Sequence, residues 1–114
     1  MPPLRTLALA YLPPLDPSSD FAEVCRGLAA DGISRIVLQE VCGSFSLADP
    51  GAGPRIARVL RDTGLQAIAC HGLEHAPYLL RQPEVDARGR MVAAHVDMLR
   101  RAADLGARTY VLHL

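Results

Sequence analysis

The chain has 114 residues, with 12 basic and 12 acidic side chains and therefore no formal net charge. Half of the residues are hydrophobic, which is enough for one domain with a real core. The zero net charge argues against an extended nucleic-acid surface, because binding along a phosphate backbone usually needs an excess of basic residues. No apolar run is long enough to span a membrane, and no secretory cleavage signal follows the first apolar segment.

The first predicted strand is Leu4–Leu12, which is nearly continuous in apolar residues, as expected for a strand covered on both faces. A helix is predicted next, because Asp20 followed by Glu23 resembles a capping box at a helix start. Apolar residues then recur at i, i+3, i+4 and i+7, which defines one helical face. Gly32 ends this helix, and Ile33–Gln39 is the second predicted strand.

The same order is then repeated. A loop is predicted over Val41–Gly53, a segment that contains glycine, serine and proline. Pro54 suits the first position of the second helix, where the missing N–H is tolerated. Gly64 ends that helix, and the apolar segment Leu65–Cys70 is the third predicted strand.

The longest predicted helix is Asp86–Leu105, and Gly106 ends it. Its apolar stripe consists of Val92, Val96, Leu99 and Ala103. The fourth predicted strand is Ala107–His113. The chain therefore alternates strands with long helical crossovers, which is typical of parallel sheets.

Two α/β architectures fit this alternation, an open doubly wound sheet and a (β/α)8 TIM barrel. No GxGxxG follows the first strand, so a dinucleotide site has little support. A complete barrel needs about 250 residues. We therefore expect a partial (β/α)8 barrel over residues 1–114, with four parallel strands and three intervening helices. Its edge strands would be unpaired, so a homodimer through the open strand edges is a further expectation.

Three segments carry a resemblance to a known family. They are Asp31–Glu40, Gly64–His71 and Leu105–His113, each a strand that follows a helix end and finishes on a polar side chain. Together they resemble the xylose isomerase-like TIM barrels, over nearly the whole chain. That superfamily contains sugar-phosphate isomerases and epimerases as well as endonuclease IV. The resemblance implies that this chain is the N-terminal half of such a barrel.

Four polar residues are predicted at the carboxyl ends of the strands, where barrel enzymes place their sites. Glu40 and His71 are the candidate catalytic residues, and a strand-end carboxylate or a packed imidazole is the structural alternative for them. The segment His75-Ala76-Pro77-Tyr78 resembles the loop in endonuclease IV whose histidine binds zinc. His113 resembles a second zinc ligand of that family. The resemblance thus implies a divalent metal, Mn²⁺, Mg²⁺ or Zn²⁺, held in part by His75 and His113.

Three functions remain open. The first is a metal-dependent sugar or sugar-phosphate isomerase/epimerase, of which this chain would be an N-terminal part that is inactive alone. The second is an endonuclease IV-like zinc phosphodiesterase, against which the neutral charge counts. The third is a non-catalytic half-barrel that self-associates. We expect a small-molecule sugar or sugar phosphate as the partner, and neither a membrane nor a nucleic acid.

The cysteines indicate the compartment. Cys25, Cys42 and Cys70 are odd in number, widely spaced and without a CxxC pair, so neither a zinc ribbon nor a disulfide framework is predicted. Reduced thiols in a cytoplasmic protein are expected instead. A nucleophilic role for Cys42 has little support, because nothing in the sequence indicates a lowered thiol pKa.

Overall fold

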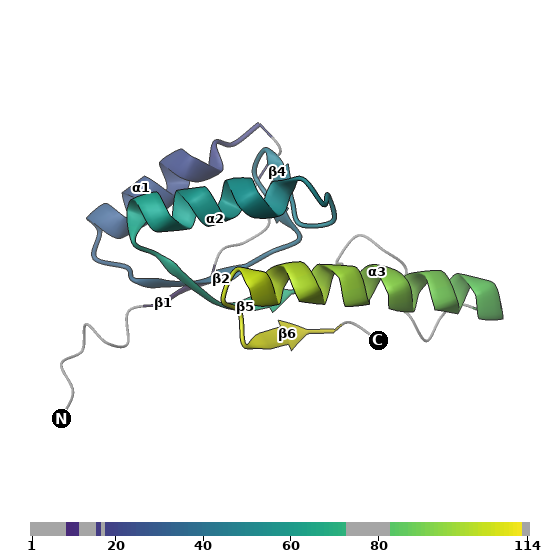
Figure 1. Cartoon of the computed structure of the whole chain (residues 1–114). Coiled ribbons are helices and arrows are strands. Elements are labelled where there is room, and N and C mark those ends of the chain that lie inside the picture. Colours follow the sequence, from purple (N-terminus) through teal and green to yellow (C-terminus); the bar gives the residue numbers. More distant parts are fainter. Residues whose placement is uncertain (1–8, 12–15, 17, 73–82, 113–114) are drawn as a thin grey trace, which may run out of the picture.

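The computed structural model describes residues 9–11, 16, 18–72 and 83–112. Within them, four strands form one parallel sheet in chain order (Figure 1). The strands are β1 (Leu9–Tyr11), β2 (Arg35–Leu38), β5 (Gln66–His71) and β6 (Thr109–Val111). The α/β class and the four parallel strands with intervening helices are thereby confirmed.

The three described helices lie on the same side of this sheet (Figure 1). They are α1 (Phe21–Ala30), α2 (Ala52–Thr63) and α3 (Val85–Asp104). The one-sided arrangement follows from the strand order, because crossovers between parallel strands are right-handed and the order never reverses. A doubly wound sheet reverses its strand order and carries helices on both faces. The described part of the chain shows no such reversal.

The start of α1 follows the sequence prediction. Asp20 accepts hydrogen bonds from the backbone N–H groups of Ala22 and Glu23 at 2.9 and 3.3 Å, and so caps the helix. Phe21 and Cys25 point from this helix into the core and are completely buried. The N-terminal half of the predicted apolar face of this helix is therefore confirmed to pack into the core.

The start of α2 differs from the prediction. The helix begins at Ala52, so Pro54 lies within the first turn rather than at the first position. This is tolerated because none of the first N–H groups of a helix has an intrahelical acceptor. At the other end, Gly64 adopts φ 75° and its N–H donates to the carbonyl of Leu60 at 2.9 Å. That left-handed residue turns the chain into β5.

A small hairpin replaces the loop predicted before α2. Strands β3 (Val41–Cys42) and β4 (Phe45–Ser46) pair antiparallel. Gly43 turns the chain at φ 64°, and the next N–H, that of Ser44, donates to the carbonyl of Ser19 at 3.0 Å. Two-residue strands are too short to show a period of two, which explains why the sequence pattern did not predict them.

The stripe predicted for α3 is present but does not form the core. Val92, Val96 and Leu99 are exposed, and the buried residues of this helix are His95, Met98 and Ala102. Both sets are spaced for one helical face, so periodicity alone could not choose between them. Helix α3 therefore has two apolar faces, of which only one packs on the rest of the protein.

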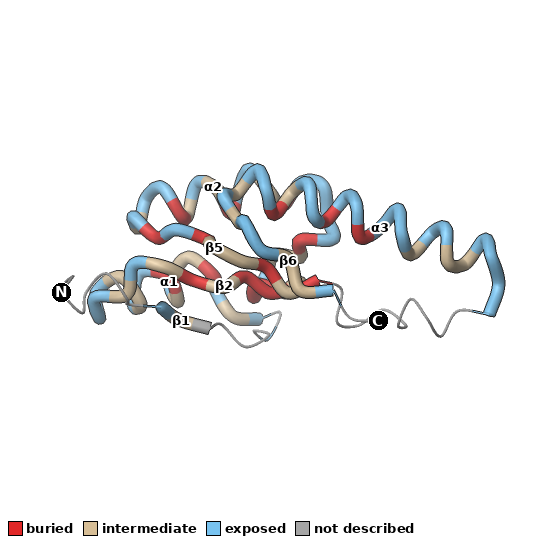
Figure 2. Tube along the Cα trace, turned by 90° about the horizontal axis from the view of Figure 1, so that it is seen from below, coloured by how far each residue is buried: buried red, intermediate tan, exposed pale blue. Residues whose placement is uncertain are grey.

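The core lies between the sheet and the helices, where buried residues are concentrated (Figure 2). From the sheet, Ile36, Leu38, Ala67 and Cys70 are buried against them. From the helices, the hairpin and the loops come Phe21, Cys25, Cys42, Leu47, Ala52, Ile56, Leu60, Leu65, Met98 and Ala102. The opposite face of the sheet is only half covered, since Val37, Ala69 and Val111 are all of intermediate exposure.

Arg101 ties α3 to the segment before α2. Its Nε donates to the carbonyl of Leu47 at 2.6 Å, and its Nη2 donates to that of Ala48 at 3.2 Å. A charged donor to a buried carbonyl is a strong hydrogen bond, so this contact fixes the flank of α3 that faces α2. Among the described residues, we find no helix both long and apolar enough to cross a membrane.

Candidate functional site

Two of the predicted site residues lie at the carboxyl edge of the sheet. His71 is the last residue of β5, and Glu40 follows the end of β2. These strands are neighbours in register, with Leu38 paired to Cys70. His71 in turn pairs with Val111 of β6. The edge that carries sites in parallel α/β proteins therefore has a carboxylate and an imidazole on adjacent strands.

Strand alternation places only His71, because Glu40 lies two residues beyond the end of β2. Leu38 and Cys70 are buried on the helix side, so His71, which follows Cys70 within β5, belongs to the opposite face. Glu40 lies close enough to Cys70 for its charge to help raise the pKa of that thiol. Glu40 is thus near Cys70, just beyond the end of β2, and Gln39 is the first residue after that strand.

Gln39 is a further candidate residue, which the sequence analysis did not single out. Its side chain is only 1% exposed, and its Oε1 and Nε2 atoms are both buried without a hydrogen-bond partner in the described part of the chain. A buried amide left unpaired costs about 1–3 kcal/mol, so its two polar atoms are candidates to bind a water, an ion or a ligand. The only available signal was a polar residue between an apolar strand and Glu40, which does not distinguish a ligand contact from a loop residue.

The three cysteines are free, buried and held in the thiol form. Loss of hydration on burial raises the pKa of Cys25 to about 12, with a contribution from nearby Cys42. Burial likewise raises the pKa of Cys42 to about 11. For Cys70, burial and then the neighbouring Cys42 and Glu40 raise the pKa to about 12. Nucleophilic cysteines need the opposite shift, so none of these thiols is suited to that role.

The metal ligands predicted from sequence cannot be placed. His75 and His113 both lie outside the described residues. Within the described ranges, no three His, Cys, Asp or Glu side chains gather in a way that could hold a metal ion. Glu40 and His71 supply a carboxylate and an imidazole, which are suitable donors for zinc or manganese but too few for a complete site.

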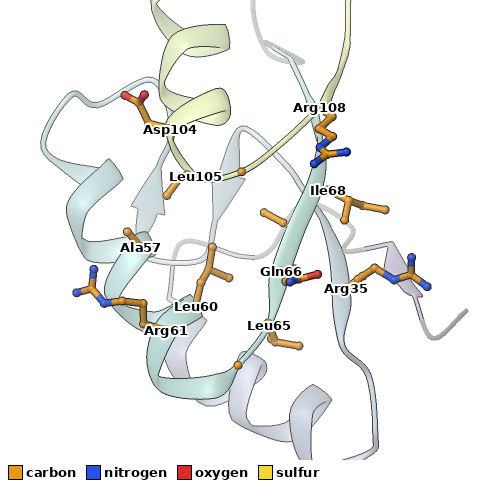
Figure 3. A pocket seen from close by; sticks show the side chains of 13 residues that line it. Arg35, Ala57, Leu60, Arg61, Leu65, Gln66, Ile68, Asp104, Leu105 and Arg108 are labelled. Atoms are coloured by element: carbon orange, nitrogen blue, oxygen red, sulfur yellow. The ribbon is translucent and has the colours of Figure 1, made fainter. Parts of the chain in front are cut away.

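A groove of about 790 Å³ lies at the amino edge of the sheet, opposite the edge that carries Glu40 and His71 (Figure 3). It is lined by the ends of α2 and α3 and by the starts of β2 and β5. Arg61 extends on the helix side and Arg35 on the other side of β5, with their guanidinium groups pointing apart. They do not converge on a common anion. Arg61 lies in the last turn of α2, where its positive charge stabilises the helix through the negative end of the helix dipole.

Neither a known protein family, nor a curated protein, nor a solved structure matches this chain. The resemblance to the xylose isomerase-like barrels therefore stays a prediction. The fold itself defines the class of protein. The chain is an α/β protein with a parallel sheet, helices on one face of that sheet, and polar residues at its carboxyl edge.

Proposed function

We propose that the sheet is part of a (β/α)8 barrel, and that the barrel belongs to a metal-dependent sugar or sugar-phosphate isomerase/epimerase. The observation that carries the proposal is that Glu40 and His71 lie at the carboxyl edge of neighbouring parallel strands. The one-sided helices support a barrel, because a closed sheet has all its helices outside and its second face turned inward.

The chemistry needs groups that these residues possess. In isomerisation or epimerisation, a proton leaves a carbon next to a carbonyl and returns to the adjacent carbon or to the other face of the same carbon. We assign the proton transfer to the Glu40 carboxylate, and we assign hydrogen bonding to the reacting oxygen to His71. The Gln39 amide offers one acceptor and two donor hydrogens, which suits a substrate with adjacent hydroxyl groups.

A divalent metal belongs to the proposal on the strength of the sequence resemblance. When bound, it would polarise the carbonyl and hydroxyl oxygens of the sugar. The described residues contribute at most Glu40 and His71 to such a site, so His75 and His113 would have to complete it. The three free cysteines fit a reducing compartment, and we place the protein in the cytoplasm on that basis.

The test is solvent exchange at carbon. The longest natural form of the protein is incubated in deuterated water with a ketopentose or ketohexose phosphate and with Mn²⁺, Mg²⁺ or Zn²⁺, and deuterium next to the carbonyl is followed by NMR. We expect exchange that falls about 100-fold or more in Glu40→Gln and His71→Gln. Glu23→Gln, which removes an exposed carboxylate from α1, serves as the matched control.

One alternative is tested alongside. Cleavage of DNA at an abasic site, without exchange on any sugar phosphate, would replace this proposal by the endonuclease IV-like phosphodiesterase. Absence of exchange, of any isomer or epimer product and of DNA cleavage in the longest form would leave the non-catalytic half-barrel.

A further inference from the structure

The outer flank of α3 is an apolar surface that the described chain does not cover. Val85, Val92, Val96 and Leu99 are 72%, 48%, 39% and 47% exposed, and Leu112 after β6 is 44% exposed. Between this flank and β6 lies a groove of about 230 Å³. It is lined by Val92, His95, Val96, Leu99, Tyr110 and Leu112. Figure 2 shows this part of α3 open to solvent, next to the edge strand of the sheet.

The exposed residues have the spacing of a helix–helix seam. Val85, Val92 and Leu99 are seven residues apart, and so are Gly89, Val96 and Ala103, all six of them exposed. The two series alternate by three and four residues, which is the a/d pattern of a coiled coil. An isolated surface helix does not need a second apolar stripe of this kind. The stripe therefore indicates that another helix packs along α3.

We propose that a second copy of this chain packs on this flank, with the two α3 helices antiparallel about a two-fold axis and the two β6 strands paired edge to edge. The seam is self-complementary in that direction, because the outer layers pair a larger residue with a smaller one and the central layers pair valine with valine. The layers are Val92 with the partner's Val96, Leu99 with the partner's Gly89, and Val85 with the partner's Ala103, and each occurs twice. A two-fold interface requires such matching, since one patch must fit itself.

Charge favours the same direction. Asp86 and Arg100 occupy equivalent heptad positions on the exposed side of the seam, fourteen residues apart on α3. Antiparallel pairing brings Asp86 close to the partner's Arg100, and the two-fold axis repeats the contact at the other end of the interface. Flanking charges of this kind set the orientation of paired helices.

A single two-fold axis can relate both the two α3 helices and the two β6 strands. His95 lies between Val92 and Val96, at the middle of the seam, and its Nδ1 is 2.9 Å from the hydroxyl of Tyr110. Tyr110 is the central residue of β6. The centre of the seam and the centre of the edge strand are therefore at the same level, so an axis through one passes near the other. Pairing of β6 with its copy would also satisfy the edge that β5 leaves free.

The first test is the mass of the 114-residue chain in solution, measured by sedimentation equilibrium over a concentration series. We expect a monomer–dimer equilibrium. Val96→Glu should raise the dissociation constant about 100-fold, because two carboxylates would be buried near the axis. Ala94→Glu introduces the same charge at an exposed position off the seam and should leave the constant unchanged. Circular dichroism checks that both variants keep their helices.

Charge reversal tests the direction. Asp86→Arg and Arg100→Asp should each weaken the dimer several-fold, and the double variant should recover the affinity of the native chain. A cysteine test is independent of affinity. Antiparallel packing places Ala93 next to its own copy, so Ala93→Cys should form a disulfide-linked dimer under mild oxidation, and Ala94→Cys should not. The three native thiols are buried and do not compete.

Several outcomes would overturn the proposal. They are a chain that stays monomeric at its highest soluble concentration, a dimer that survives Val96→Glu, or open-ended oligomers, which would indicate association through β1. A dimer without recovery in the double charge variant would overturn the antiparallel orientation. None of these outcomes bears on Glu40 or His71, so the proposed reaction and this interface fail separately.

Discussion

Replacing Gln39 by methionine is expected to stabilise the protein. Gln39 is 1% exposed, and neither atom of its amide group is hydrogen-bonded within the described residues. Methionine has a similar length and no group that must be hydrogen-bonded, and it adapts to irregular packing. The substitution removes the cost of two unpaired polar atoms without opening a cavity. A buried polar group without a partner costs about 1–3 kcal/mol, so we expect a gain of about 1–3 kcal/mol in the free energy of unfolding.

The measurement is urea denaturation at one low protein concentration, so that self-association does not add to the stability. A gain of 1 kcal/mol should also raise the melting temperature by about 4–8 °C in a domain of roughly this size. Gln66→Met is the matched control, because Gln66 is exposed on β5 and should change little. If Gln39→Met instead lowers the stability by 1 kcal/mol or more, the amide is hydrogen-bonded in solution and our account of it is wrong.

The same variant separates stability from function. If the Gln39 amide contacts substrate hydroxyls, Gln39→Met should weaken the binding of a sugar phosphate while it stabilises the fold. A trade-off between the stability of the fold and the binding of a ligand is common at functional sites, where polar groups are kept unpaired for a ligand. A variant that is more stable and retains full solvent exchange would show that Gln39 takes no part in the reaction.

Three further predictions concern the fold. Gly43→Ala should destabilise the fold by at least about 2 kcal/mol in urea melts, because Gly43 has a left-handed backbone and a Cβ there would overlap the carbonyl of Ser19. Gly27→Ala has open space around it and should stabilise the fold by about 0.5–1 kcal/mol in the same assay. Asp20→Ala should cost about 1 kcal/mol through the lost cap of α1, seen as a lower urea midpoint. Burial raises the pKa of the three cysteine thiols to about 11–12 from an ordinary value of 9.0. The folded state then holds protons that the unfolded chain releases, so stability should fall as pH rises from about 9 to about 11, and native thiols should resist alkylation at pH 8.

Much of the fold could be predicted because local signals agreed with one another. Asp20 predicted the start of α1 as its N-cap residue. A glycine with positive φ follows each of the three helices, at Gly32, Gly64 and Gly106. Apolar runs between those glycines and the next loop gave β2, β5 and β6. These signals are short-range, and each has a direct steric or hydrogen-bonding cause.

The errors arose where the deciding interaction is distant in sequence. Periodicity revealed the exposed stripe of α3, but only packing shows that Met98 and Ala102 face the sheet instead. Likewise, nothing local indicates that Arg101 reaches the carbonyl of Leu47 across the fold. A helix with two apolar faces leaves its orientation undecided until its neighbours are known.

The candidate site was predictable only by position. Glu40 and His71 were found because strand ends are where such sites occur, and the structure puts both at that edge. Their relation to each other was not predictable. It depends on which residue of β2 faces the helices, and a shift of one residue exchanges Glu40 with Gln39. Gln39 became a candidate only through its burial and its two unpaired atoms.

Both proposals have the same physical origin. Parallel sheets are normally covered on both faces, yet the described helices lie on one face only, and α3 keeps a second apolar flank exposed. A sheet with helices on one face has two unmet requirements: the half-covered face that carries Val37, Ala69 and His71 needs a further layer, and the flank beyond β6 needs a cover. A second copy at the flank meets only the second requirement. The dimer should therefore still gain stability from Gln39→Met, whereas a longer form with a complete barrel should gain less, because added strands offer the amide new partners.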